Sequence, residues 1–161
     1  MDIKKVFVYG FFGAIGAVIL SLLSAVGGFA GAGTSLLVIS LGVNVLAASL
    51  IGGVTAAAAF HTLIKGVDSF LVKTAEEKEK RAGTPVKAPS LAQNRRYLWG
   101  SVSYFISTVI GVNLITSLIS NPTWSVIATI IGSGLLGLLG LAVVVKLKLW
   151  EPDFKQKDEQ R

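Results

Sequence analysis

Two asparagines lie within long apolar stretches that hold no ionised side chain. Asn44 lies in GVNVLAASLI, and Asn113 lies in GVNLITSLI, where Ser117 follows it by one helical turn. An amide without a hydrogen bond in an apolar medium costs several kcal/mol, so each asparagine needs a partner. The pattern predicts hydrogen bonds between helices, with the two amides at similar depth, where they could meet. Alternatively, these amides and the neighbouring hydroxyls line a path for water or a neutral solute, although the sequence shows no filter.

The groups that catalysis and metal binding need are missing. His61 is the only histidine, and the chain has no cysteine. One imidazole does not make a zinc or haem site, so we expect no metal and no cofactor, and we interpret His61 as an interfacial hydrogen-bonding residue. The apolar stretches hold no Asp, Glu, Lys or Arg, the groups that proton and sodium pathways usually use. P-loop, GxSxG, HExxH and GxGxxG motifs are also absent, so we predict that the protein is not an enzyme.

Glycine recurs at three-residue intervals in two apolar stretches, GFFGAIG and GLLGLLG. These glycines are Gly10, Gly13, Gly16, Gly134, Gly137 and Gly140. Small residues let helix backbones approach closely, so that dispersion contacts hold helices together in lipid. We therefore predict that the first and last membrane helices pack through these glycines, either on each other, on a second copy of the chain or on another subunit.

Membrane-spanning helices have to position these side chains. The 161-residue chain is 52% hydrophobic and 15% charged, with a mean hydropathy of +0.69, whereas a soluble domain carries about 25% charged residues. A hydrocarbon core of roughly 30 Å needs about 20 apolar residues in a helix. The sequence therefore predicts one all-α integral membrane domain, with four transmembrane helices at residues 6–27, 34–64, 97–120 and 124–145. The first is longer than the apolar core of a signal peptide, so we expect it to be retained.

All the charged residues lie outside these four segments. The 15 basic and 9 acidic residues fall in the first five positions, in a loop at residues 65–96 and in a tail at residues 146–161. The other two connections, GGFAGAG and SNPT, are neutral. Because Lys and Arg accumulate in cytoplasmic loops, we predict that both termini and the charged loop are cytoplasmic, with a bacterial inner membrane as the default location. Topology also explains the net charge of +6, so we expect no nucleic-acid partner.

Two local patterns refine the helix boundaries. Asn121 and Pro122 are typical of an N-cap and a first helical position. The segment 34–64 is longer than a straight span requires, and helical spacing of apolar residues continues beyond it to about Ala82. This extension is either an interfacial amphipathic helix or a solvated helix that contacts a partner, and a flexible loop is the remaining alternative.

The sequence favours a non-catalytic role. We expect a structural or accessory subunit of a larger membrane complex, which packs on other membrane subunits or on itself through its glycine-rich helix faces. The charged loop is expected to contact anionic lipid or a soluble partner. An oligomeric channel or small-solute pathway lined by Asn, Ser and Thr is the first alternative. A membrane regulator of the immunity or exclusion type is the second.

Overall fold

The fold is all-helical apart from one very short strand pair. A computed structural model describes residues 18–19, 21–83, 89–90, 97–147 and 153–154. Four helical segments are long and apolar enough to cross a membrane, namely Ser21–Ser40, Val45–Thr74, Leu98–Leu118 and Pro122–Lys146. The two-residue strands β1 (Pro89–Ser90) and β2 (Asp153–Phe154) pair antiparallel. The prediction of an all-α chain is confirmed, and so is the prediction of four helices that are long and apolar enough to span a membrane.

The first span is helical where the sequence predicted a loop. It continues without a break through the π-helix η1 (Val26–Gly33) into α2 (Thr34–Ser40). Glycine is common in turns, so the composition of GGFAGAG predicts a connection. In lipid, however, a turn would leave backbone groups without hydrogen bonds, so the chain stays helical. The predicted boundary between residues 27 and 34 is therefore wrong, and residues 6–17 and 20 of the predicted first span lie outside the described residues.

The first reversal of the chain lies at residues 41–44 instead. Gly42 has a φ of +88°, a left-handed conformation that glycine adopts at little steric cost. The next helix, α3 (Val45–Ala82), is 38 residues long, or about 57 Å at 1.5 Å per residue. The predicted continuation of this helix to about Ala82 is confirmed. Gly83, with a φ of +64°, follows its last residue, a common way for a helix to end.

The second hairpin lies where the sequence predicted it. Helix α4 (Tyr97–Leu118) is followed by α5 (Pro122–Lys146). The side-chain oxygen of Asn121 accepts hydrogen bonds from the backbone N–H groups of Thr123 at 3.1 Å and Trp124 at 3.2 Å. Pro122 takes the first helical position. The predicted cap is confirmed.

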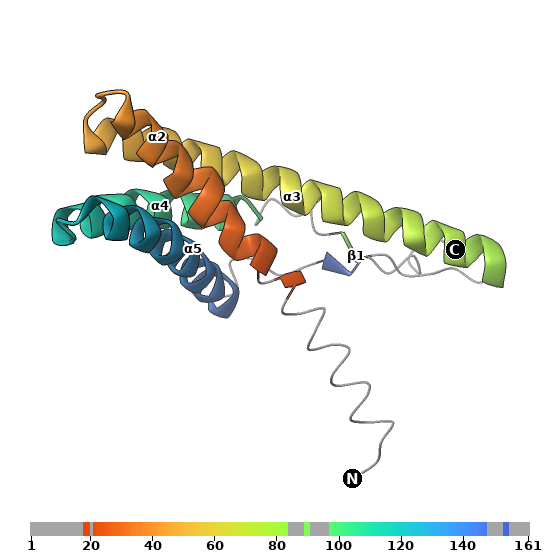
Figure 1. The fold of residues 1–161 in the computed structure, drawn as a ribbon. Helices are drawn as coiled ribbons and strands as arrows, with labels where there is room; N and C mark the ends of the chain where they lie inside the picture. The colour runs from red at the N-terminus through yellow and green to blue at the C-terminus, as the bar shows by residue number, and fades with distance from the viewer. Residues whose placement is uncertain (1–17, 20, 84–88, 91–96, 148–152, 155–161) are drawn as a thin grey trace, which may run out of the picture.

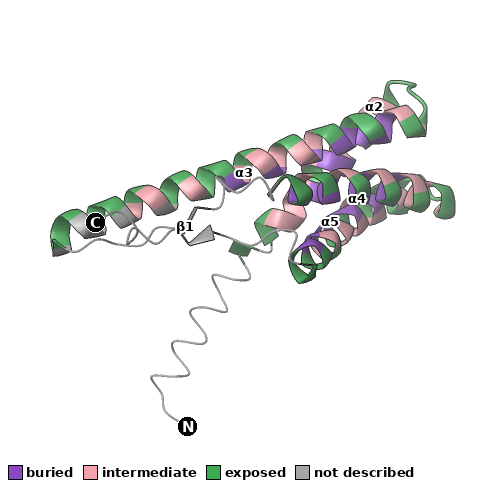
Figure 2. Ribbon diagram, turned by 180° about the vertical axis from the view of Figure 1, so that it is seen from behind, coloured by how far each residue is buried: buried purple, intermediate pink, exposed green. Residues whose placement is uncertain are grey.

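The four helices form a bundle in which the first span crosses over the other three. Helix α4 contacts both α3 and α5, and η1 contacts α3, α4 and α5 (Figure 1). Both hairpin turns lie at the same end of the bundle, and α3 extends well beyond the other helices at the opposite end. Figure 2 shows the buried residues on the helix sides that face one another, whereas the far end of α3 is largely exposed.

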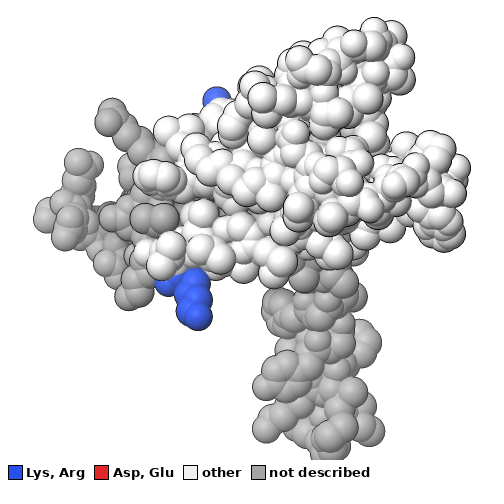
Figure 3. All heavy atoms as spheres, turned by 90° about the vertical axis from the view of Figure 1, so that its left-hand side faces the viewer, with Lys and Arg blue, Asp and Glu red and all other residues white. Residues whose placement is uncertain are grey.

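Charge is absent from the hairpin end of the bundle. Figure 3 looks at that end and shows a surface without acidic side chains, with basic groups only at its margins. Neither reversal, at residues 41–44 or 119–121, holds a charged residue. Among the described residues, charges begin at Lys65 on α3 and at Lys146 on α5. The bundle therefore has one neutral end and one charged end.

Candidate functional site

The first span packs closely against its neighbours around η1. Gly27, Gly28 and Gly31 are buried. A Cβ atom added to Gly27 would lie 2.9 Å from the carbonyl oxygen of Ser133, and one added to Gly28 would lie 2.6 Å from that of Ile130. Side-chain Cβ atoms do not approach backbone oxygens so closely. Only glycine therefore lets the first span rest directly on the backbone of α5.

The same face of the first span also touches α3 and α4. A Cβ atom at Gly31 would lie 2.6 Å from the Thr108 hydroxyl oxygen and 2.9 Å from the Cβ of Ala56. One turn later, the Ser35 hydroxyl donates a 3.1 Å hydrogen bond to the carbonyl of Gly31 and faces Gly52 of α3. Gly27, Gly31 and Ser35 follow one another at four-residue intervals, a small-residue pattern typical of membrane helix packing. That spacing was the signal in the sequence for this contact, and the loop interpretation missed it.

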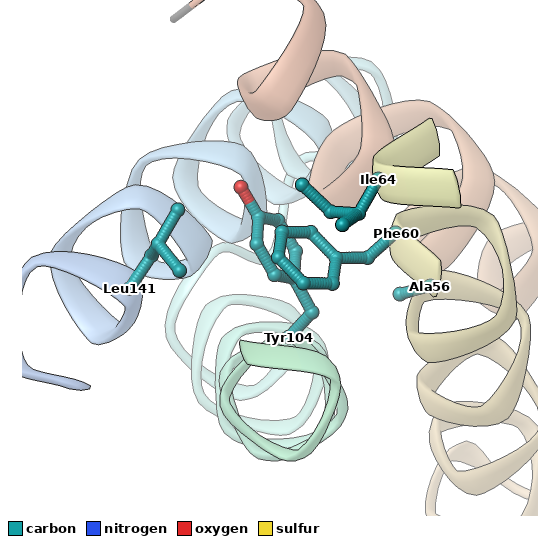
Figure 4. Packing of buried hydrophobic residues seen from close by; sticks show 5 residues of the cluster. All are labelled: Ala56, Phe60, Ile64, Tyr104 and Leu141. Atoms are coloured by element: carbon teal, nitrogen blue, oxygen red, sulfur yellow. The ribbon is translucent and has the colours of Figure 1, made fainter. Parts of the chain in front are cut away.

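Two aromatic rings fill the bundle next to η1. The rings of Phe60 on α3 and Tyr104 on α4 stack with their centroids 4.8 Å apart and an interplanar angle of 24°. Both residues are fully buried, and Ile64 and Leu141 lie beside them (Figure 4). The Tyr104 hydroxyl donates a 3.0 Å hydrogen bond to the carbonyl of Leu23. This cluster joins all four helices, and the sequence interpretation singled out neither ring.

Several hydroxyl groups are buried where the helices meet. Within the described part of the chain, five buried hydroxyls have no hydrogen-bond partner, namely those of Ser101, Ser103, Thr108, Thr129 and Ser133. At least two of them face glycine. A Cβ added to Gly111 would lie 2.6 Å from the Ser133 hydroxyl oxygen, as at Gly31 and Thr108. Weak Cα–H···O contacts recur where helices pack closely. The cluster therefore has the geometry of helix packing.

The two intramembrane asparagines do not meet. Asn113 donates a 2.7 Å hydrogen bond to the Ser49 hydroxyl of α3 and a 2.8 Å bond to the carbonyl of Val109 on its own helix. Asn44 is exposed in the first reversal, where its side-chain oxygen accepts a 2.8 Å hydrogen bond from the backbone of Ala47. The prediction that Asn44 lies inside the second span is therefore a misassignment. It followed from the misplaced first hairpin.

Ser117 makes a local hydrogen bond. Its hydroxyl donates to the carbonyl of Leu114 at 2.8 Å, and the residue is exposed on the surface of α4. Hydroxyl groups in membrane helices commonly satisfy their hydrogen-bonding capacity in this way. Ser117 and Asn113 therefore do not form a joint polar site.

The glycines of α5 pack within the chain. A Cβ at Gly134 would lie 2.7 Å from the carbonyl oxygen of Ser24 in the first span, and one at Gly137 would lie 2.7 Å from the ring of Tyr104. Gly140 lies against the hydroxyls of Ser103 and Ser107. The first span thus meets α5 at Gly134, whereas Gly137 and Gly140 face α4. Gly10, Gly13 and Gly16 lie outside the described residues.

The Asn113 contact gives a first prediction. Asn113→Leu removes the hydrogen bond to Ser49, and we expect the coupling free energy between Asn113→Leu and Ser49→Ala to be about 0.6 kcal/mol, the average for interhelical hydrogen bonds in membranes. Unfolding of the single and double variants in mixed micelles measures this coupling. A coupling near zero would show that the bond contributes nothing to the fold.

Two open grooves flank α3. The larger, about 700 Å³, lies between α3 and the first span and is lined by Val26, Ala59, Thr62, Leu63, Gly66, Val67 and Phe70. The smaller, about 550 Å³, lies between α3 and α4 and is lined by Val54, Ala57, Ala58, His61, Leu98, Ser101, Val102 and Phe105. Both linings are almost entirely apolar. Across the described residues, no three His, Asp or Glu side chains gather as metal ligands would.

Comparison of this chain with protein-family models, with curated proteins and with solved structures found no match.

Proposed function

We propose that this protein is a non-catalytic subunit of a larger membrane complex, and that the groove between α3 and the first span binds an apolar helix of a partner membrane protein. The observation that carries this proposal is the exposed apolar surface at the charged end of α3. Val67 is 40% exposed and Phe70 is 70% exposed, and both line the groove.

Lipid alone covers this groove poorly, because the groove runs from the acyl-chain region of the membrane into the headgroup region. About 20 helical residues cross the hydrocarbon core. Helix α3 carries no charge from Val45 to Ile64, and Lys65 follows. Ala59 and Leu63 therefore lie at acyl-chain depth, whereas Val67 and Phe70 lie at headgroup depth. Acyl chains cover only the first part of the groove, while a partner helix that crosses the boundary covers all of it.

The interior of the bundle favours this role over a channel. The stacked rings of Phe60 and Tyr104 occupy the space between the helices. Asn44 caps a helix at the surface, and Asn113 is bonded to Ser49. The two asparagines that would line a solute path are therefore apart, and each one is hydrogen-bonded. An immunity or exclusion regulator would use the same groove, and the identity of the bound protein separates that role from a permanent subunit.

Orientation is part of the same proposal. We place the charged end of the bundle and both termini in the cytoplasm of a bacterial cell, because Lys and Arg accumulate on that side of membrane proteins. Reporter domains that are active only in the cytoplasm are fused to each terminus, and we expect both fusions to be active. Signals from opposite compartments would contradict the four-span arrangement.

Photo-cross-linking from the groove tests the partner. We expect p-benzoylphenylalanine at position 70 to give a cross-linked product with another membrane protein in cells. The same group at Ser69, which is exposed and about 100° away around α3, serves as the matched control. Mild-detergent extraction followed by native mass measurement is expected to give a species heavier than the monomer.

A substitution that fills the groove gives a second test of partner binding. A Cβ atom at Gly66 meets nothing within 4 Å, so Gly66→Leu should leave the bundle folded while it fills the groove. We expect recovery of the partner to fall by about tenfold, the loss that roughly 1.4 kcal/mol of interface energy produces. Cross-links that are equal at both positions or confined to the chain itself, or recovery only as a lone monomer, would overturn the proposal.

A further inference from the structure

The groove between α3 and α4 differs from the partner groove in its depth. Its lining on α3 runs from Val54 to His61, which all precede Lys65, and its lining on α4 runs from Leu98 to Phe105. Seven residues of helix cover about 10 Å, roughly two-thirds of one leaflet of a 30 Å core. The whole groove therefore lies at acyl-chain depth, in the leaflet on the charged side.

The shape of this groove suits a hydrocarbon chain. Ala57, Ala58 and Ser101 contribute small side chains to its lining, and Val54 and Phe105 line its deeper end. At Gly53, below the deeper end, the Phe105 ring rests on the α3 backbone, because a Cβ there would lie 2.8 Å from the ring. A helix from a partner protein would need a longer surface, whereas one acyl chain fills a slot of this length.

An imidazole and an ammonium group lie at the end of the groove nearest the charged side. His61 lines the groove there. Lys65 follows His61 by one turn on nearly the same side of α3 and is exposed. Its ammonium group therefore lies near headgroup depth. Asp68 lies three residues further along. Basic residues at the end of an apolar cleft between membrane helices are the arrangement that recognises anionic headgroups.

We propose that this groove is a binding site for one phospholipid with a net negative headgroup. One acyl chain lies between α3 and α4, and Lys65, beside His61, holds the headgroup phosphate. This site is independent of the partner groove, because the two grooves lie on different sides of α3 and share no lining residue.

Native mass spectrometry of the full-length chain tests the site. The protein is released from nanodiscs that contain equal amounts of phosphatidylglycerol, phosphatidylethanolamine and phosphatidylcholine. We expect one phosphatidylglycerol to remain bound per chain. Ala58→Leu, at an exposed position of the groove, should reduce this retention, whereas Gly66→Leu, in the partner groove, should not. Lys65→Gln should reduce the preference for phosphatidylglycerol about fivefold, as expected for one basic residue at an anionic surface, and Lys73→Gln, with the same change of charge, should reduce it less.

Three results would overturn the proposal. Equal retention of the three lipids would show that the charged end does not recognise the headgroup. Preference for phosphatidylethanolamine would show that Asp68, and not Lys65, sets the selectivity. A dimer that Ala58→Leu dissociates would assign the groove to a second copy of the chain. Because these readouts need no partner protein, they remain informative if the subunit proposal fails.

Discussion

Gly31→Leu is expected to separate the first span from the rest of the bundle. A Cβ atom at this position would lie 2.6 Å from the Thr108 hydroxyl oxygen and 2.9 Å from both the Cγ2 of Thr108 and the Cβ of Ala56. The first span is in contact with three helices and cannot move away from one without losing another. We therefore expect a loss of about 3 kcal/mol in the free energy of unfolding, the upper end of the range for overpacked sites.

Gly33→Leu is the matched control for this prediction. Gly33 lies in the same π-helix, but a Cβ there would meet only the carbonyl oxygen of Gly28, at 3.8 Å. Unfolding of both variants in mixed micelles, followed by tryptophan fluorescence, measures the difference. Similar losses for Gly31→Leu and Gly33→Leu would mean that the effect comes from the helix itself and not from the contact with α3 and α4.

The second half of the fold could be predicted closely from the sequence. The spans expected at residues 97–120 and 124–145 correspond to α4 (Tyr97–Leu118) and α5 (Pro122–Lys146). The reason is that local chemistry marks both ends of these helices. An Asn-Pro pair separates them, and its capping role does not depend on tertiary contacts. Charged residues mark their other ends. The end of α3 was also predictable, because periodic apolar and charged residues persist beyond the uncharged stretch that ends at Ile64, and Gly83 follows the last helical residue.

The first half was predicted less well because glycine has two uses in membranes. GGFAGAG has the composition of a turn, and composition does not show that neighbouring helices press against it. Because the chain is helical there, the reversal lies at residues 41–44. Asn44 therefore caps α3, and Asn113 donates its hydrogen bond to Ser49 and not to Asn44. One misplaced hairpin thus produced the error in the predicted polar site.

The aromatic core could not be inferred from periodicity. In a soluble helix, an apolar stripe marks the buried face. In a membrane helix, the faces towards lipid and protein are both apolar, so periodicity does not distinguish Phe60, which is fully buried, from Phe70, which is exposed. Only the contacts of the folded chain separate a core residue from a binding surface.

Tyr104→Ala is expected to be the most destabilising single truncation in the bundle. It removes a fully buried ring that stacks on Phe60 and lies against Gly137. Truncation of a buried aromatic residue usually costs about 3 to 5 kcal/mol. Because the separated helices still lie in lipid, the transfer part of that cost is smaller than in water, and packing and the cavity supply the rest. We therefore expect a loss of about 3 kcal/mol.

Tyr104→Phe separates the ring from its hydroxyl. This variant keeps the stacking but loses the hydrogen bond to the carbonyl of Leu23, so we expect a loss of about 1 kcal/mol. Unfolding of both variants under identical conditions measures the ratio. If Tyr104→Phe were as damaging as Tyr104→Ala, the hydrogen bond to the first span would be the main contribution. In that case the first span would be held chiefly by a polar contact, and the close glycine packing around η1 would be secondary.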